Sequence, residues 1–140
     1  MFSFKLLAKD KPRHLLGIGE IVDIFEVVKR GIDLFDCVLP TRLARTGRLF
    51  SKKAERFQIH IRNEQYTNDP RPIENECECY TCRNFSRAYL RHLLMAKKLL
   101  AIQLASIHNL YFLESLMRRI RTAIKEKGLS ELKKEWFSTT

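Results

Sequence analysis

The stretch CECYTC, residues 77–82, places three thiols within six residues, and a histidine follows at His108. Thiolate sulfur and imidazole nitrogen are ligands that zinc prefers, and three cysteines with one histidine fill a closed structural site. The alternative is a disulfide, but such frameworks are typical of small secreted chains, and the two thiols of a C-x-C pair are poorly placed to bridge each other. The spacing therefore predicts one structural zinc bound by Cys77, Cys79 and Cys82; local spacing leaves His108 open as the fourth ligand or an ordinary side chain.

Length and charge bound the class of protein. The chain has 140 residues, of which 45% are hydrophobic, which is enough for one ordinary domain. A formal charge of +10 indicates attraction to a polyanion, although charge alone does not choose between RNA, DNA and an anionic membrane. The first ten residues contain no apolar run typical of a signal peptide, and no later segment is expected to reach membrane-spanning length. The composition therefore favours a cytoplasmic protein in a reducing compartment, with no membrane partner.

Residues 14–39 carry a strand, helix and strand pattern. A short apolar run at 14–19 ends in glycines and predicts a buried strand followed by a tight turn. Residues 20–30 have a helical apolar stripe, with Gly31 as the expected left-handed stop. Residues 32–39 predict a second strand, which Pro40 is expected to end. This order predicts a right-handed βαβ unit with parallel strands.

Asp36 is the unusual residue of the second predicted strand. By the period of two, it shares a face with Leu34 and Val38. A carboxylate among apolar neighbours is costly unless it is paired or takes part in chemistry. Asp36 is therefore a candidate catalytic residue, and the alternative is a structural acid that is solvated or bonded to a backbone amide.

The remaining two thirds of the chain read mainly as helix. Residues 57–61 alternate like a short strand, and residues 68–72 predict a loop that leads to the cysteines. A helix is expected at about 84–104, and Asn109 is a candidate cap for a further helix that stops at Gly128. The tail, residues 129–140, predicts a short amphipathic helix. His60 and His92 are treated as ordinary histidines because neither has a cysteine at ligand spacing.

Four separated motifs resemble one family in the same order. They are DCVLPTR at residues 36–42 followed by Ala44, Arg45 and Gly47, the three cysteines, SRAYL at 86–90, and IHN at 107–109. Together they resemble the C-terminal part of the tRNA-guanine transglycosylases, also called queuine tRNA-ribosyltransferases, of the bacterial type. The distance from Cys82 to His108 matches the zinc spacing of that family, so the resemblance assigns His108 as the fourth ligand.

The resemblance implies an α/β fold, the C-terminal portion of a TIM (β/α)8 barrel. Residues 15–19 and 33–39 would then be the seventh and eighth barrel strands. The implied organisation is residues 1–47 as the last βαβ part of the barrel with the nucleophile strand, residues 48–108 as a zinc-binding insertion with a long helix, and residues 109–140 as a closing helix and tail.

The resemblance also implies a reaction. Asp36 would be the nucleophile that attacks C1′ of the wobble guanosine in a tRNA anticodon loop, so that a 7-deazaguanine base, preQ1 or queuine, replaces guanine in queuosine biosynthesis. Two displacements at one anomeric carbon through a covalent intermediate suit a carboxylate and need no redox cofactor. Leu16 and Gly17 would line the pocket for the flipped-out base, and Arg42 and Arg45 would contact the anticodon loop next to that base.

The chain resembles only part of that enzyme. The segment that carries the family's second catalytic aspartate has no counterpart here, so we expect the isolated chain not to exchange bases. Two alternatives stay open: a zinc-stapled module that binds tRNA without chemistry, and a subunit that forms a homodimer or pairs with a full-length transglycosylase.

Overall fold

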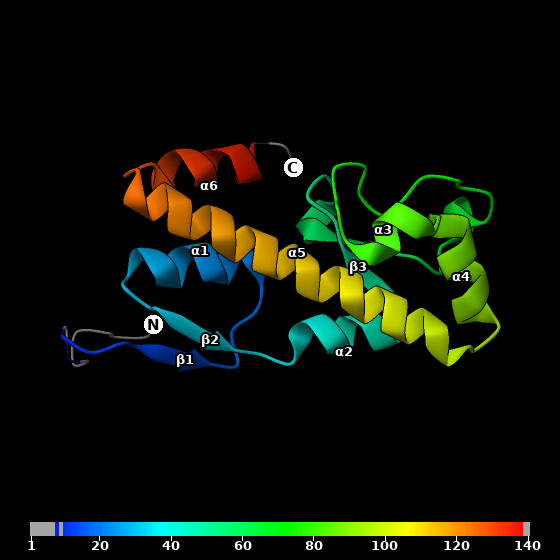
Figure 1. Ribbon diagram of the computed structural model, residues 1–140, viewed down its shortest axis with the longest axis horizontal. Helices are drawn as coiled ribbons and strands as arrows, with labels where there is room; N and C mark the ends of the chain where they lie inside the picture. The colour runs from blue at the N-terminus through cyan, green and yellow to red at the C-terminus, as the bar shows by residue number, and fades with distance from the viewer. Residues whose placement is uncertain (1–7, 9, 139–140) are drawn as a thin grey trace. The chain divides into compact units, whose positions relative to one another are not determined.

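The computed structural model describes residue 8 and residues 10–138 (Figure 1). The chain divides into two units, residues 1–39 and 40–140. The first unit contains β1 (His14–Leu16), α1 (Ile21–Lys29) and β2 (Leu34–Asp36). The remaining elements follow in order: α2 (Leu39–Thr46), β3 (Arg48–Phe50), η2 (Glu55–Phe57), β4 (Gln58–His60), η3 (Glu64–Tyr66), α3 (Tyr80–Asn84), α4 (Arg87–Met95), α5 (Leu99–Lys125) and α6 (Leu129–Phe137). The mixed, helix-rich α/β composition agrees with the expected fold class.

The first unit is the predicted strand, helix and strand unit. β1 and β2 pair in parallel, and Leu16 lies opposite Asp36 in the register. Gly31 has a φ of +87° just after α1, as the predicted left-handed stop requires. The strand expected within residues 14–19 is present as β1, but the expectation that it is buried is wrong, because Leu16 is 66% exposed. The described part of this sheet contains only two strands, which leaves one edge of each strand without a partner strand.

Pro40 lies in the first turn of a helix, where the sequence predicted only the end of a strand. β2 stops at Asp36, and α2 starts at Leu39, so the strand expected over residues 32–39 is shorter than predicted. Proline suits the first turn of a helix, because its fixed φ is already helical and its missing N–H has no partner there. Pro40 is buried together with Leu43 and Ala44, so α2 packs along the side that carries these residues.

A small hairpin follows α2 in the second unit. β3 and β4 pair antiparallel, with Leu49 opposite Ile59. The strand predicted at residues 57–61 is confirmed as β4, whereas its partner β3 was not predicted. Leu49 and Phe50 are completely buried, which fixes the face of the hairpin that meets the core.

The helix boundaries differ from the prediction. A break at residues 96–98, with Lys97 at a φ of 55°, separates α4 from α5. α5 then runs unbroken for 27 residues, so Asn109 lies buried inside a helix and does not cap one. At its end, Lys127 takes the left-handed conformation and Gly128 precedes α6, which confirms the helix predicted in the tail.

α5 is the central helix of the second unit. It contacts α3, α4, β3 and α6. By length and composition alone it could cross a membrane, so the expectation that no segment reaches such a length is wrong. Its buried residues include Leu104, His108 and Leu116, which is the pattern of a helix that packs on a protein core.

Candidate functional site

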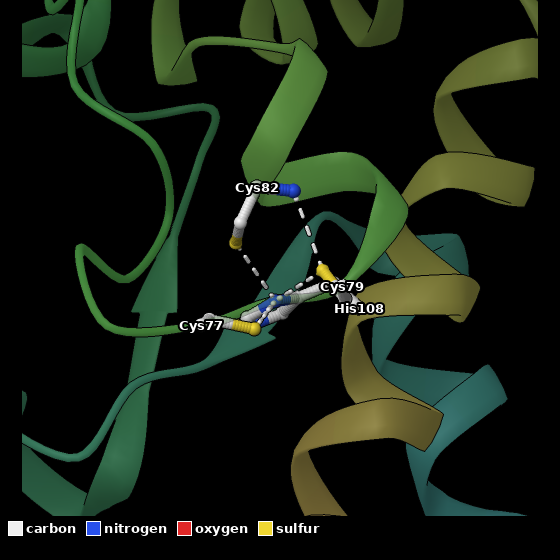
Figure 2. Close-up of side chains that lie close together, drawn as sticks. All are labelled: Cys77, Cys79, Cys82 and His108. Atoms are coloured by element: carbon white, nitrogen blue, oxygen red, sulfur yellow. Dashed lines mark hydrogen bonds between the residues drawn. The ribbon is translucent and has the colours of Figure 1, made fainter.

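Four predicted zinc ligands meet in the second unit (Figure 2). Cys77 lies in the loop before α3, Cys79 caps α3, Cys82 lies within α3, and His108 comes from α5. Their ligand atoms all lie within 4.8 Å of one another. The structure therefore brings together residues that are up to 31 positions apart in sequence.

The distances in this group fit a tetrahedral metal. Nδ1 of His108 lies 3.8 Å from Sγ of Cys77, 3.6 Å from Sγ of Cys79 and 3.3 Å from Sγ of Cys82. Zinc bonds of about 2.3 Å to sulfur and 2.0–2.1 Å to nitrogen, at a tetrahedral angle, separate the two ligand atoms by about 3.6 Å. The observed separations bracket this value, so the group fits a single tetrahedral ion.

A hydrogen bond at Nε2, on the side of the ring away from the sulfurs, sets the orientation of His108. Its Nε2 lies 2.8 Å from the carbonyl oxygen of Phe50, which can only accept a hydrogen bond. Nε2 therefore carries a proton and donates it, which leaves Nδ1 as the nitrogen that faces the three sulfurs and could bind a metal after losing its proton. The side chain is completely buried, so this orientation is held in place by the fold.

The thiols interact strongly with one another. The hydrogen bond from Cys77 holds the pKa of Cys79 well below its usual range, and contacts with Cys77 and Cys79 raise the pKa of Cys82 far above it. Burial lowers the pKa of His108, but its contacts with Cys77 and Cys79 outweigh this and raise the pKa to about 9. Three adjacent sulfurs cannot all ionise on their own, and a bound divalent cation would displace their protons.

A charged network that the sequence did not predict fixes the loop before the cysteines. The carboxylate of Asp69 accepts hydrogen bonds from Nε and Nη2 of Arg71, both at 2.8 Å, and from Nη1 of Arg87 at 3.2 Å. The bonds from Arg71 hold the pKa of Asp69 well below its usual range. Arg87 also donates to the carbonyl of Ile73, so α4 and the loop are joined. The only sequence signal was the turn composition of residues 68–72.

The candidate nucleophile and base-pocket residues lie together at one end of the two-stranded sheet. Asp36 is opposite Leu16, and the Gly17 N–H donates to the Asp36 carbonyl oxygen at 2.7 Å. Gly17 has a φ of +79°, which favours glycine, and a β-carbon there would meet no atom within 4 Å. The Asp36 side chain is exposed, as either a nucleophile or a solvated acid requires.

The candidate RNA contacts lie on α2. Arg42 and Arg45 are both exposed and, three residues apart, share one side of the helix. His60 and His92 are exposed and lie outside the metal-ligand group, as does Cys37.

One family model matches the whole chain. The family described as queuine tRNA-ribosyltransferase matches residues 1–140. The chain is 53% identical over 131 residues to a queuine tRNA-ribosyltransferase of Thermoanaerobacter pseudethanolicus, covering 94% of this chain and 34% of that protein. It is 49% identical to a putative queuine tRNA-ribosyltransferase of Archaeoglobus fulgidus over 94% of this chain and 34% of the relative. For the Bacillus licheniformis protein the identity is 46%, over 97% and 35%. The chain therefore spans about a third of the length of these curated relatives.

Proposed function

Because this chain belongs to the queuine tRNA-ribosyltransferase family, we propose that it forms the C-terminal part of an enzyme that exchanges guanine at the tRNA wobble position for a 7-deazaguanine base. The observation that carries the proposal is the family match over residues 1–140. The acceptor would be the anticodon loop of a tRNA, and the incoming base would be preQ1 or queuine.

Asp36 is the proposed nucleophile. Its carboxylate oxygen bonds to C1′ of the ribose as the glycosidic bond to guanine breaks, and guanine leaves with the bonding electrons and takes up a proton. The incoming base then loses a proton and attacks C1′, which releases the carboxylate and retains the configuration. The position of Asp36 at the carboxyl end of a parallel strand supports this role, since active sites of barrels lie at that end.

Leu16 and Gly17 are the proposed base contacts. Leu16 offers an apolar side chain that is 66% exposed beside Asp36, and Gly17 lets a planar base approach the backbone closely. Arg42 and Arg45 are the proposed contacts to anticodon-loop phosphates, for which their exposure and the +10 charge of the chain are suited.

The proposed metal is one structural zinc ion bound by Cys77, Cys79, Cys82 and His108. Three thiolates and one imidazole match the preference of zinc and leave no open position for a substrate, so the ion would hold α3 and its loop to α5 without taking part in the exchange.

The proposed place of the chain in the complete enzyme is the end of a TIM barrel. Residues 1–47 would supply the last two strands, residues 48–108 the zinc-binding insertion, and residues 109–140 the closing helix and tail. The parallel pairing of β1 and β2 across α1 supports this, and so do the exposed apolar side chains of Leu16 and Leu34, which suit cover by further parts of a barrel.

A second candidate function is a tRNA-binding subunit without chemistry, either as a homodimer or with a full-length transglycosylase. It is favoured by the +10 charge of the chain, which suits binding to a polyanion. In that case binding of tRNA would not depend on the Asp36 carboxylate.

A chimera tests the proposal. This chain would replace the matching third of the Thermoanaerobacter pseudethanolicus relative, and incorporation of labelled guanine into tRNA would be measured. We expect exchange by the chimera, a loss of about 1,000-fold or more with Asp36→Asn, and wild-type exchange with Asp23→Asn, a matched change on α1. Full exchange by the Asp36→Asn chimera would refute the nucleophile, and sustained exchange by the isolated chain would refute the view that it is only part of the site.

A further inference from the structure

Asn109 is a buried hub of hydrogen bonds next to the metal-ligand group. Its side chain is completely buried in α5, directly after His108. Its Oδ1 accepts from the Phe50 N–H at 3.0 Å, and its Nδ2 donates to the carbonyl oxygens of Pro40 at 2.9 Å and Arg48 at 3.1 Å. Both amide protons and the amide oxygen are therefore used, which fixes the orientation of this side chain.

His108 and Asn109, which are consecutive in α5, bind the backbone C=O and N–H of Phe50. Nε2 of His108 donates to the Phe50 carbonyl, and Oδ1 of Asn109 accepts from the Phe50 N–H. The Phe50 ring stacks on Phe112, one turn further along α5, at 5.5 Å between ring centroids. The residue that orients the metal-binding histidine is thus held on three sides by the same helix.

The third contact of Asn109 reaches α2. Pro40 lies in the first turn of this helix, which is only eight residues long and carries Arg42 and Arg45. A helix of that length is not stable by itself in water, so tertiary contacts decide where it sits. Asn109 supplies a buried contact of this kind, and it does so from the position next to a metal ligand.

We propose that Asn109 is a positioning residue that couples the metal centre to α2 and thereby holds Arg42 and Arg45 in place for RNA. The second part rests on the proposed function of the two arginines. Asparagine suits the role better than aspartate, because Nδ2 faces two carbonyl oxygens, whereas a carboxylate oxygen in that place would face them without a proton.

The experiment uses the full chain and five variants. Asn109→Ala removes the hub, and Asn84→Ala is the matched control, since Asn84 is exposed and donates to the nearby Tyr80 carbonyl oxygen. Leu132→Ala removes a buried side chain of α6 and controls for a general loss of stability. The double variant Arg42→Ala/Arg45→Ala is studied with and without Asn109→Ala.

Three quantities are measured: metal content by native mass spectrometry, hydrogen exchange of backbone amides in residues 39–50, and the Kd for a synthetic anticodon stem-loop RNA. With Asn109→Ala we expect one metal ion per chain as in the wild type, exchange in residues 39–50 faster by about tenfold, and a Kd raised by about fivefold. In the background without Arg42 and Arg45, we expect Asn109→Ala to cause no further weakening, since residues that act through one another are not additive.

The outcomes separate the two parts of the proposal. If Asn109→Ala leaves the rate of amide hydrogen exchange in residues 39–50 unchanged, or raises it only as much as Leu132→Ala does, the positioning role would be overturned. An additive effect on the Kd would overturn the coupling to the arginines. Wild-type Kd values in the arginine variant, or no RNA binding by the wild-type chain, would overturn their proposed RNA contact, while faster local exchange would still support the link to α2. If Asn109→Ala does not fold, Asn109→Ser should give the same local signature more weakly.

Discussion

Replacement of one metal ligand tests whether a bound zinc ion stabilises the second unit. Cys82→Ser exchanges a buried sulfur, 3.3 Å from Nδ1 of His108, for a hydroxyl that binds zinc poorly. Cys37→Ser is the matched control, because Cys37 lies outside the metal-ligand group. We expect one zinc ion per wild-type and Cys37→Ser chain, and close to none per Cys82→Ser chain.

The expected loss of stability is large because of where the ligands lie. Cys79 and Cys82 belong to the same buried cluster as Leu90 and Leu104, and α3 is only five residues long. Structural zinc contributes about 10–16 kcal/mol to folding of small metal-dependent peptides, against a total stability of about 5–15 kcal/mol for an ordinary domain. Loss of the ion should therefore melt α3 and its loop, and not merely lower the unfolding midpoint.

Native mass spectrometry with and without a strong chelator reads the metal stoichiometry, and urea unfolding followed by Trp136 fluorescence reads the stability. Cys82→Ser and the chelated wild type should unfold at a much lower urea concentration than Cys37→Ser. Retention of one metal ion and of the wild-type midpoint by Cys82→Ser would refute the reasoning. So would a wild-type chain that contains no metal and is nevertheless folded, since the apolar core would then be sufficient.

Two further predictions concern ion pairs. Asp69→Asn should lower the free energy of unfolding by about 1.5–3 kcal/mol, because a buried carboxylate that accepts from Arg71 and Arg87 is lost; a urea midpoint within error of the wild type would contradict this. Glu135, whose bond from Arg119 lowers its pKa to about 2, should stabilise the fold fully above its unfolded pKa of about 4.3 and lose this effect as the pH falls toward 2. The difference in melting temperature between wild type and Glu135→Gln should therefore be present at about pH 6 and vanish in strong acid, and a difference independent of pH would contradict it.

The parts of the fold that depend on local sequence could be predicted. The spacing of the cysteines and the period of α1 act within a few residues, and both gave correct predictions: a metal-ligand group and a helix that stops before Gly31. The family resemblance supplied His108, which local spacing could not assign.

The parts that depend on distant partners could not be predicted. Asparagine is a typical helix cap, so Ile107-His108-Asn109 indicated a helix start. In the fold, the same side chain lies inside α5 and contacts Phe50 and Pro40, which are 59 and 69 residues away in the sequence. The break before α5 contains neither glycine nor proline. Lys97 takes the left-handed conformation there, and no local sequence signal predicted the break.

The surroundings of Asp36 explain why the isolated chain should lack activity. Its neighbours Leu16, Leu34 and Val38 are 66%, 53% and 48% exposed, so the exposed carboxylate stands on an open apolar face of the sheet, in contact with water. A hydrated carboxylate is a weak nucleophile, and an oxocarbenium-like transition state needs fixed dipoles in a site that excludes water. Further parts of a barrel around this face would shield the apolar side chains and the carboxylate from water. We therefore expect the chain to gain exchange activity only when the rest of the family's fold covers Asp36.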